Sequence, residues 1–368
     1  MFRRSLFAIL TLALGAVPQG QQPVIQNGRV EVRQTTAIDR ELSGLNSGEP
    51  VWAAWRVPIV AGRRGGCCVY NDDAIAPNGI RGCFVDGPAI TGASGLPQVD
   101  PARGALPALQ ALPIEAGSGL VLLLRLVNGR VERMRTVGDD CPLDAGGRTV
   151  YWLQGVTPAE SLRFLDGLVR QTGAAALAEE PRLRDAALSA AAMHADAGAD
   201  VILDRVATAD ADNGQRRLAR TLLGSARGAH GFIMLRRLLE AERFPDIRRQ
   251  LVGALGQTRE AGAADVFLAL ARNDTDPRIR AEAVYWLPQR AGAQGTRDAL
   301  AIVNDDAADI VMQRGVQGLA RASTGDPTTT LLELARTSQK PMVKKEAVAA
   351  LGRSRDPRAL QFLEGLLK

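Results

Sequence analysis

One sequence pattern recurs at a fixed interval of 32 residues through the second half of the chain. It is clearest in the nine residues that begin at Ile279, and stepping by 32 without a gap gives six anchor positions: Leu183, Gln215, Ile247, Ile279, Val311 and Val343. A fixed period of this size is typical of a solenoid, in which each unit buries its apolar face against its neighbours. The C-terminal half is therefore expected to be a stack of helical repeats.

Within each repeat, the apolar positions predict two helices joined by a turn. Four residues after the anchor the side chains are mostly small, which lets neighbouring helices approach closely: Ala187, Ala219, Leu251, Ala283, Gly315 and Ala347. Later in each repeat, mostly apolar residues recur as pairs separated by one helical turn, such as Leu331 and Leu334, which places them on one face of a second helix. Such a helix cannot bury its apolar stripe alone. We therefore expect about six helix pairs, stacked as an α-solenoid over residues 179–368.

A separate helix is predicted between the two halves of the chain, within residues 156–178. Thr157 is an N-cap residue, Pro158 suits the first helical position, and Glu160 can close a capping box with Thr157. An apolar stripe follows, from Leu162 to Val169. The open end of a solenoid leaves apolar surface in water, so this adaptor helix is expected to cover the first face of the array.

Two stretches of the array resemble a known family. Asp276-Pro277-Arg278-Ile279-Arg280-Ala281-Glu282-Ala283-Val284 resembles the first helix of a HEAT repeat, in the short form common in bacteria and found in phycobilisome-lyase-like proteins. The stretch Pro341–Gly352 resembles it as well. The resemblance covers about residues 179–368, although Gln215 and Ala191 depart from the pattern. It implies a protein-binding scaffold with a curved groove.

The N-terminal region, residues 21–155, is predicted to be a small β-rich domain. Its clearest element is a hairpin, because Asn128-Gly129 takes the positive φ of a two-residue turn readily and joins two β-type runs. The first arm is apolar on both faces near Leu122, which is typical of a covered central strand. In the second arm, Val131 is expected on the same face as Val137. The whole chain is thus predicted to be an α+β multidomain protein.

Two tryptophans stand in one predicted strand, Val51–Val60. Trp52 and Trp55 are three residues apart, so a regular strand points them to opposite faces. Packing in the core and against the next domain is the favoured role for this pair, ahead of a ligand platform.

The cysteines all lie in the N-terminal region, at Cys67, Cys68, Cys83 and Cys141. An even number of cysteines in an exported chain favours two disulfides. Neighbouring Cα atoms are too close for an unstrained bond between Cys67 and Cys68. Two pairings remain open: Cys67–Cys83 with Cys68–Cys141, or Cys67–Cys141 with Cys68–Cys83. Free thiols, or a thiolate metal cage beside Asp139 and Asp140, are alternatives that the spacing favours less.

Residues 1–20 are typical of an export signal. Arg3 and Arg4 precede an apolar run from Leu6 to Val17, which is too short to span a bilayer. A buried N-terminal helix is the alternative interpretation. The protein is therefore expected to be exported, to the periplasm or outside the cell, with no membrane span.

A column of basic residues follows the anchors, at Arg184, Arg216, Arg248, Arg280 and Lys344, with Met312 interrupting it. One hypothesis is a binding surface for acidic partners. The favoured alternative is a ladder of ion pairs within the array, with Asp or Glu of adjacent turns, such as Asp212, Asp246 and Asp276, as partners. At the C-terminal end, Phe362 and several leucines crowd the last helix, which suggests self-association through that helix.

Composition and motifs argue against several functions. The net charge of +5 is spread over scattered arginines mixed with acids, so no nucleic-acid partner is expected. Deoxyhypusine hydroxylases among HEAT-like proteins hold iron with His-Glu pairs, whereas His194 and His230 are followed by Ala195 and Gly231. No phosphate-binding loop, zinc-protease motif or nucleophile elbow is present, and no cofactor or metal is expected.

The predicted function is therefore that of an exported, non-enzymatic scaffold that binds protein through the solenoid surface. An accessory factor or enzyme with its site in the cysteine-bearing domain is the alternative.

Overall fold

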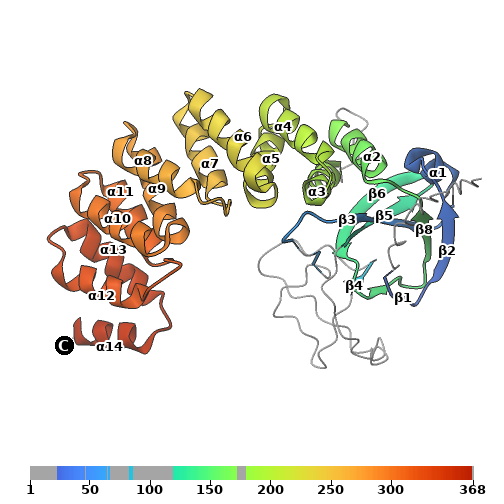
Figure 1. Cartoon of the computed structure of the whole chain (residues 1–368). Coiled ribbons are helices and arrows are strands. Elements are labelled where there is room, and N and C mark those ends of the chain that lie inside the picture. Colours follow the sequence, from blue (N-terminus) through green and yellow to red (C-terminus); the bar gives the residue numbers. More distant parts are fainter. Residues whose placement is uncertain are drawn as a thin grey trace, which may run out of the picture.

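The computed structural model describes residues 23–45, 47–63, 65–66, 83–85, 119–171 and 180–366. The predicted export signal, Cys67, Cys68 and the last two residues lie outside these ranges. A β-rich unit lies at one end of the molecule, and a run of paired helices extends from it in an arc to the C-terminus (Figure 1). This is the predicted fold class: strands in the N-terminal region and a helical solenoid in the C-terminal half.

The main sheet has five strands in the order β2-β8-β3-β5-β6: Arg29–Gln34, Thr149–Gln154, Val51–Pro58, Gly119–Val127 and Arg130–Gly138. β8 pairs parallel to both β2 and β3, while β5 pairs antiparallel to β3 and β6. The β5–β6 hairpin turns at Asn128 and Gly129, with φ of 50° and 70°. This confirms the predicted hairpin, and β5 is the predicted covered strand, buried along most of its length.

A smaller sheet packs on one face of the main sheet. It consists of β1 (Ile25–Gln26), β7 (Leu143–Asp144) and β4 (Cys83–Phe84), paired in parallel in the order β1-β7-β4. The core on this side contains Trp52, whereas Trp55 belongs to the core on the other side, which continues into the helices. The two tryptophans thus point to opposite faces, as predicted.

The face assignment of β6 is wrong at its start. A register shift between Arg125 and Leu126 pairs Leu126 with Val131 and Arg125 with Arg133, which leaves Glu132 as an extra residue. Val131 therefore packs with the helix-side core, while Val137 packs with the opposite core. A β-bulge of this kind exchanges the faces of the residues beyond it.

Two helices cover the helix-side face of the sheet: α1 (Ile38–Gly44) and the adaptor helix α2 (Pro158–Arg170). The Thr157 hydroxyl accepts a hydrogen bond from the Glu160 N–H at 3.1 Å, as predicted for an N-cap. The Glu160 carboxylate does not complete the capping box. It accepts instead from the Ile38 N–H at 2.8 Å and so caps α1, a helix 122 residues away in the chain.

Six helix pairs follow, and each anchor residue lies in the first helix of its pair. They are α3 (Glu180–Met193) and α4 (Gly198–Ala209), α5 (Asn213–Ala226) and α6 (Gly228–Ala241), α7 (Pro245–Leu255) and α8 (Ala263–Asn273), α9 (Pro277–Arg290) and α10 (Gly292–Asp305), α11 (Asp309–Leu319) and α12 (Pro327–Thr337), α13 (Pro341–Gly352) and α14 (Pro357–Leu366). α2 packs against α3, which is the position predicted for the adaptor.

Glycines allow the first helices of adjacent repeats to pack closely. A Cβ atom at Gly318 in α11 would lie 2.5 Å from the Tyr285 carbonyl oxygen in α9. A Cβ at Gly224 in α5 would lie 2.1 Å from the Ala254 carbonyl oxygen in α7. Real Cβ atoms do not approach backbone this closely, so these positions require glycine. Among the described residues, no helix combines the length and the apolar character that crossing a membrane requires.

Candidate functional site

Three buried polar side chains join the sheet to the helical array. The Trp55 indole N–H of β3 donates to the Ser161 hydroxyl oxygen of α2 at 2.9 Å, and Ser161 Oγ lies 2.9 Å from His194 Nε2. His194 Nδ1 lies 2.8 Å from the Ala190 carbonyl oxygen. A carbonyl can only accept, so Nδ1 carries the imidazole proton and Nε2 accepts from the Ser161 hydroxyl. We call Trp55, Ser161 and His194 the joint.

Backbone contacts reinforce the joint. Val60 N–H donates to the Met193 carbonyl at 2.9 Å and Ala195 N–H donates to the Pro58 carbonyl at 3.1 Å, so the chain after β3 pairs with the α3–α4 turn. Phe164 packs edge-on against the Trp55 ring, with centroids 5.8 Å apart.

The joint does not have the accessibility of a catalytic Ser–His pair. Ser161 and His194 are each 0% exposed, so no substrate reaches them. Burial lowers the pKa of His194 to about 4, and the imidazole is therefore neutral near pH 7. Each of its nitrogens has a partner in that state. The arrangement holds two units together rather than performing chemistry.

Three members of the predicted basic column form ion pairs inside the array with acids of adjacent turns, although not with the three aspartates named as examples. Arg184 pairs with Asp210 at 3.0 Å, Arg248 with Asp274 at 2.7 Å, and Arg280 with Asp306 at 2.8 Å. Each acid is the C-cap residue of the second helix in the same repeat as its arginine. We call these pairs the ladder.

The three acids expected as partners have other contacts. Asp212 accepts from the Gly214 N–H as the N-cap of α5. Asp246 and Asp276 both pair with Arg278, at 3.2 and 2.9 Å. The predicted ladder is therefore confirmed, but the acid at the end of the second helix reaches the arginine, rather than the three aspartates named as examples.

The remaining members of the column differ from this arrangement. Arg216 donates to the Asp210 carbonyl oxygen and to Asn213 Oδ1, and Lys344 is exposed. At the interruption, Met312 and Ser338 replace the arginine and the acid of the ladder.

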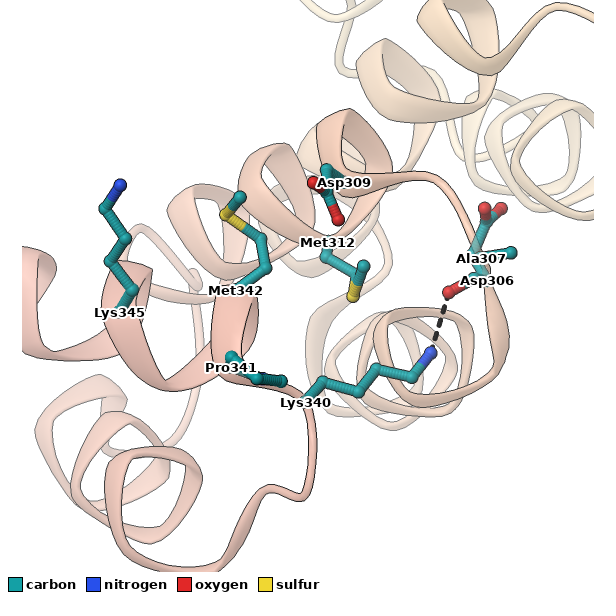
Figure 2. A pocket seen from close by; sticks show the side chains of 8 residues that line it. All are labelled: Asp306, Ala307, Asp309, Met312, Lys340, Pro341, Met342 and Lys345. Carbon is teal, nitrogen blue, oxygen red and sulfur yellow. Dashed lines mark hydrogen bonds between the residues drawn. The ribbon is translucent and has the colours of Figure 1, made fainter.

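A hollow of about 440 Å³ lies beside Met312. Lys340 Nζ donates a hydrogen bond to the Asp306 carbonyl oxygen at 2.7 Å. Figure 2 shows the Met312 and Met342 side chains between this hydrogen bond and Lys345.

Two aromatic rings of α9 each carry a stacked arginine. The Arg290 guanidinium lies over Trp286, 5.4 Å from the ring centroid, and Arg314 of α11 lies over Tyr285 at 4.0 Å. The Trp286 indole N–H donates to Glu282 at 3.0 Å, and Arg314 also pairs with Glu282, at 3.1 Å. We call Glu282, Tyr285, Trp286, Arg290 and Arg314 the aromatic–arginine cluster. Its side chains are partly exposed, which suits a surface for binding rather than a core.

The structure also brings arginines to the turns between first and second helices. Arg259, Arg321 and Arg355 are exposed, and none of them contacts a carboxylate among the described residues. Arg290 ends α9 at the corresponding turn. Burial, and then the neighbouring Arg259 guanidinium, lower the pKa of Arg290. We call Arg259, Arg290, Arg321 and Arg355 the turn-arginine row.

The described cysteines are buried beneath the small sheet. Cys83 and Cys141 are 1% and 2% exposed and belong to the core that contains Trp52. Both are disulfide-bonded in the structure. The choice between the two predicted pairings depends on Cys67 and Cys68, outside the described ranges, and stays a prediction. Nearby Asp139 pairs with Arg56 at 2.7 Å, and no group of potential metal ligands occurs among the described residues.

The C-terminal edge of the array is partly apolar. Leu360 and Leu366 are 61% and 57% exposed. Phe362 is half-buried, with the Arg336 guanidinium 5.3 Å from its ring centroid. A groove of about 780 Å³ lies between α12 and α14, bordered by Leu332, Phe362 and Leu366.

The sequence of the array matches a known family. The family profile of HEAT repeats matches residues 233–320 and 296–368. These residues are HEAT repeats. No curated protein matches the chain.

Two solved structures resemble part of the chain. The complex of CpcE and CpcF of phycocyanin lyase from Nostoc sp. PCC7120 has 19% sequence identity and a TM-score of 0.34, and the match covers 42% of this chain and 99% of that chain. Human deoxyhypusine hydroxylase in complex with glycerol has 13% identity and a TM-score of 0.27, with 56% of this chain and 90% of that chain covered. These values describe a likeness in helical fold alone.

Sequence reasoning missed the aromatic–arginine cluster and the turn-arginine row. Comparison of the repeats at the 32-residue interval contained a partial signal for the row, because Arg227, Arg259 and Arg355 fall at the same repeat position, where repeats four and five have Ala291 and Ser323. The cluster had no such signal, since Tyr285 and Trp286 occur in one repeat and Arg314 comes from the next.

Proposed function

We propose that this protein is an exported, non-enzymatic scaffold that binds a protein partner through the surface of its HEAT array. The observation that carries the proposal is the aromatic–arginine cluster, which holds two partly exposed rings and two guanidiniums in fixed positions on adjacent first helices. Aromatic and arginine side chains dominate the energetically important positions of protein interfaces. By contrast, most positions that recur in every repeat are occupied by residues that pack in the core.

Export is supported by the charged and apolar pattern of residues 1–20 and by cysteines in disulfide bonds. Disulfides persist in oxidising compartments, so the periplasm or the cell exterior is the proposed location. Cell fractionation tests this point, and recovery of the full-length protein in the cytosol would contradict it.

Site-specific photo-crosslinking tests the binding surface with the full-length chain. A photo-reactive residue replaces Gln313, which is exposed on α11 and precedes Arg314 of the cluster in the chain. The matched control replaces Arg297, exposed on α10. We expect a partner adduct from position 313 and none from position 297 in the envelope fraction. Equal labelling from both positions, or from neither, would argue against this surface.

The enzyme alternative has its own measurement. Thiol titration of native and denatured protein, with and without reductant, distinguishes disulfides from reactive thiols, and metal analysis detects zinc. A reactive native thiol or stoichiometric zinc would contradict the scaffold-only function.

We further propose that two copies associate through the C-terminal edge, because Leu360 and Leu366 leave apolar surface in water there. The position of Leu366 in its repeat corresponds to Leu334, which is 6% exposed where another repeat follows.

A further inference from the structure

The two edges of the array differ in how their arginines are neutralised. On the edge with turns between successive repeats, the ladder pairs Arg184, Arg248 and Arg280 with acids at 2.7 to 3.0 Å. On the edge with turns inside each repeat, the turn-arginine row has no such acids. Its exposed members lack a carboxylate contact in the described parts of the chain. Positive charge is therefore available at the turns of repeats three to six, whereas Arg227 at the corresponding turn of repeat two pairs with Asp200.

Arg290 is the preorganised member of the row. Its Nε donates to the Gly256 carbonyl oxygen at 2.6 Å, and its guanidinium carbon lies over the Trp286 ring. The indole fits because a Cβ at position 256 would lie 2.1 Å from Trp286 Cε2, which only glycine avoids. Neither Nη nitrogen of Arg290 donates to a described residue. A guanidinium held in this way presents two parallel N–H donors, the geometry that a carboxylate accepts in a bidentate contact.

The acids along this edge leave the row largely uncompensated. Asp326 and Asp356 both hold Arg358, at 2.7 and 2.6 Å. Glu260 follows Arg259 and makes no ion pair with a described residue.

We propose that the turn-arginine row binds an extended, acidic segment of a partner protein, with Arg290 receiving one of its carboxylates. This inference rests on the proposed scaffold function and names the partner's chemistry. Adjacent repeats place their turns about 10 Å apart, the spacing of packed helices. Three residues of extended chain span about the same distance, so an acidic side chain at every third residue matches the row.

A protein segment suits this edge better than a nucleic acid. Nucleic acids carry a charge at every nucleotide, and Glu260, which follows Arg259 in the chain and has no ion-pair partner among the described residues, repels a continuous polyanion. A peptide can place its acids opposite the arginines alone.

Fluorescence anisotropy with the full-length protein tests the proposal. The probe is a labelled peptide of about twelve or more residues, enough to span four turns, with Glu at every third position. A peptide with Gln in place of Glu, and a single-stranded oligonucleotide of equal charge, serve as comparisons. The test variant is Arg290→Gln with Arg321→Gln. The matched control is Arg217→Gln with Arg249→Gln, which removes the same charge from exposed positions on first helices.

The acidic peptide is expected to bind the wild type, and the Gln peptide is not. The test variant is expected to weaken binding at least about tenfold, and the control variant less than about twofold. Equal weakening by both variants would overturn the proposal, because net charge alone would then explain it. Absence of peptide binding, or tighter oligonucleotide binding lost in the test variant, would overturn it as well.

The crosslinking experiment distinguishes a failure of this inference from a failure of the proposed scaffold function. If the Arg290→Gln, Arg321→Gln variant still crosslinks the same partner from position 313, the scaffold function stands and the acidic-segment inference fails. Loss of both the peptide and the partner supports both.

Discussion

The Trp55 indole nitrogen and the Ser161 hydroxyl oxygen lie 2.9 Å apart, although 106 residues separate them in the chain. The contact crosses from the central part of the sheet to the adaptor helix. Ser161 also reaches His194 in the first repeat, so one hydroxyl connects three structural units. The β-rich region and the helical array are therefore joined by satisfied, buried hydrogen bonds as well as by apolar packing.

Replacing Ser161 by Ala is expected to destabilise the protein by about 1–3 kcal/mol, because the Trp55 N–H and His194 Nε2 lose their partner in a dry environment. Chemical denaturation followed by tryptophan fluorescence measures the change. Ser43→Ala is the control, since that exposed hydroxyl bonds only the Arg40 carbonyl. A stability equal to the wild type would show that the joint contributes nothing.

The stability of the protein is expected to depend on His194 between about pH 6.5 and 4. The pKa is about 4 in the folded state, because of burial first, while the unfolded imidazole has its ordinary value near 6.5. The unfolded state therefore binds the proton at higher pH. The free energy of unfolding falls by about 3 kcal/mol as the pH falls through this window, and the loss is complete below it.

Denaturation at a series of pH values measures this slope, and His194→Gln is expected to lose this part of it. Asp196 favours the protonated imidazole and Arg227 opposes it, so both are kept unchanged. An identical slope in His194→Gln would assign the pH dependence to other groups.

The ladder can be tested by replacing one of its ion pairs with the residues that stand at the same positions of the next repeat. Arg280→Met is expected to cost about 1–3 kcal/mol, since it leaves the Asp306 carboxylate, 10% exposed, without its guanidinium. The double variant Arg280→Met, Asp306→Ser reproduces the Met312 and Ser338 combination of the next repeat. Ser338 Oγ accepts from the Lys340 N–H at 3.2 Å, as Asp306 accepts from Ala308 N–H at 2.8 Å. The double variant is therefore expected to be more stable than the single one. Additive losses in a double-mutant cycle would contradict coupling.

Gly318→Ala is expected to destabilise the array by about 1–3 kcal/mol, because the new methyl group would lie 2.5 Å from the Tyr285 carbonyl oxygen. Gly365→Ala is the matched helical control, with no atom within 4 Å of the added Cβ. It is expected to be neutral or stabilising by up to about 1 kcal/mol. Thermal unfolding of both variants gives the comparison, and equal effects would refute close helix packing at Gly318.

Self-association through the C-terminal edge is expected to disappear in Leu366→Glu, because a charge there disfavours burial of the edge against a second copy. Light scattering gives the molar mass. Val201→Glu on α4 is the control, since Val201 is 70% exposed and α4 lies far from the C-terminal edge (Figure 1). A wild type that is already monomeric ends this proposal.

Much of the fold follows from local sequence. The fixed repeat interval placed all six helix pairs, because each anchor repeats the same packing demand. Asn128-Gly129 determined a hairpin, since the turn requires positive φ at both residues. The spacing of Trp52 and Trp55 fixed their opposite faces. These features depend on interactions within a few residues or one repeat.

Contacts between distant segments decided the rest. Sequence spacing did not identify Asp210, Asp274 and Asp306 as the acids of the ladder, because the partner depends on how a turn folds back over the preceding helix. Glu160 could bond its own helix or another, and the approach of α1 decided it. The bulge at Glu132 reversed the face of Val131, and no residue pattern in the sequence predicted the bulge.

The sequence by itself determined a β-rich region, an adaptor helix and a solenoid of helix pairs, because periodic apolar residues impose the elements in which they are buried. Only the tertiary structure decided which polar groups are paired within the protein and which remain available to a partner. The basic column was a candidate surface by sequence, yet Arg184, Arg248 and Arg280 are neutralised by acids brought to them by the next turn. The turn-arginine row keeps its charge because folding brings no carboxylate to its exposed members within the described chain.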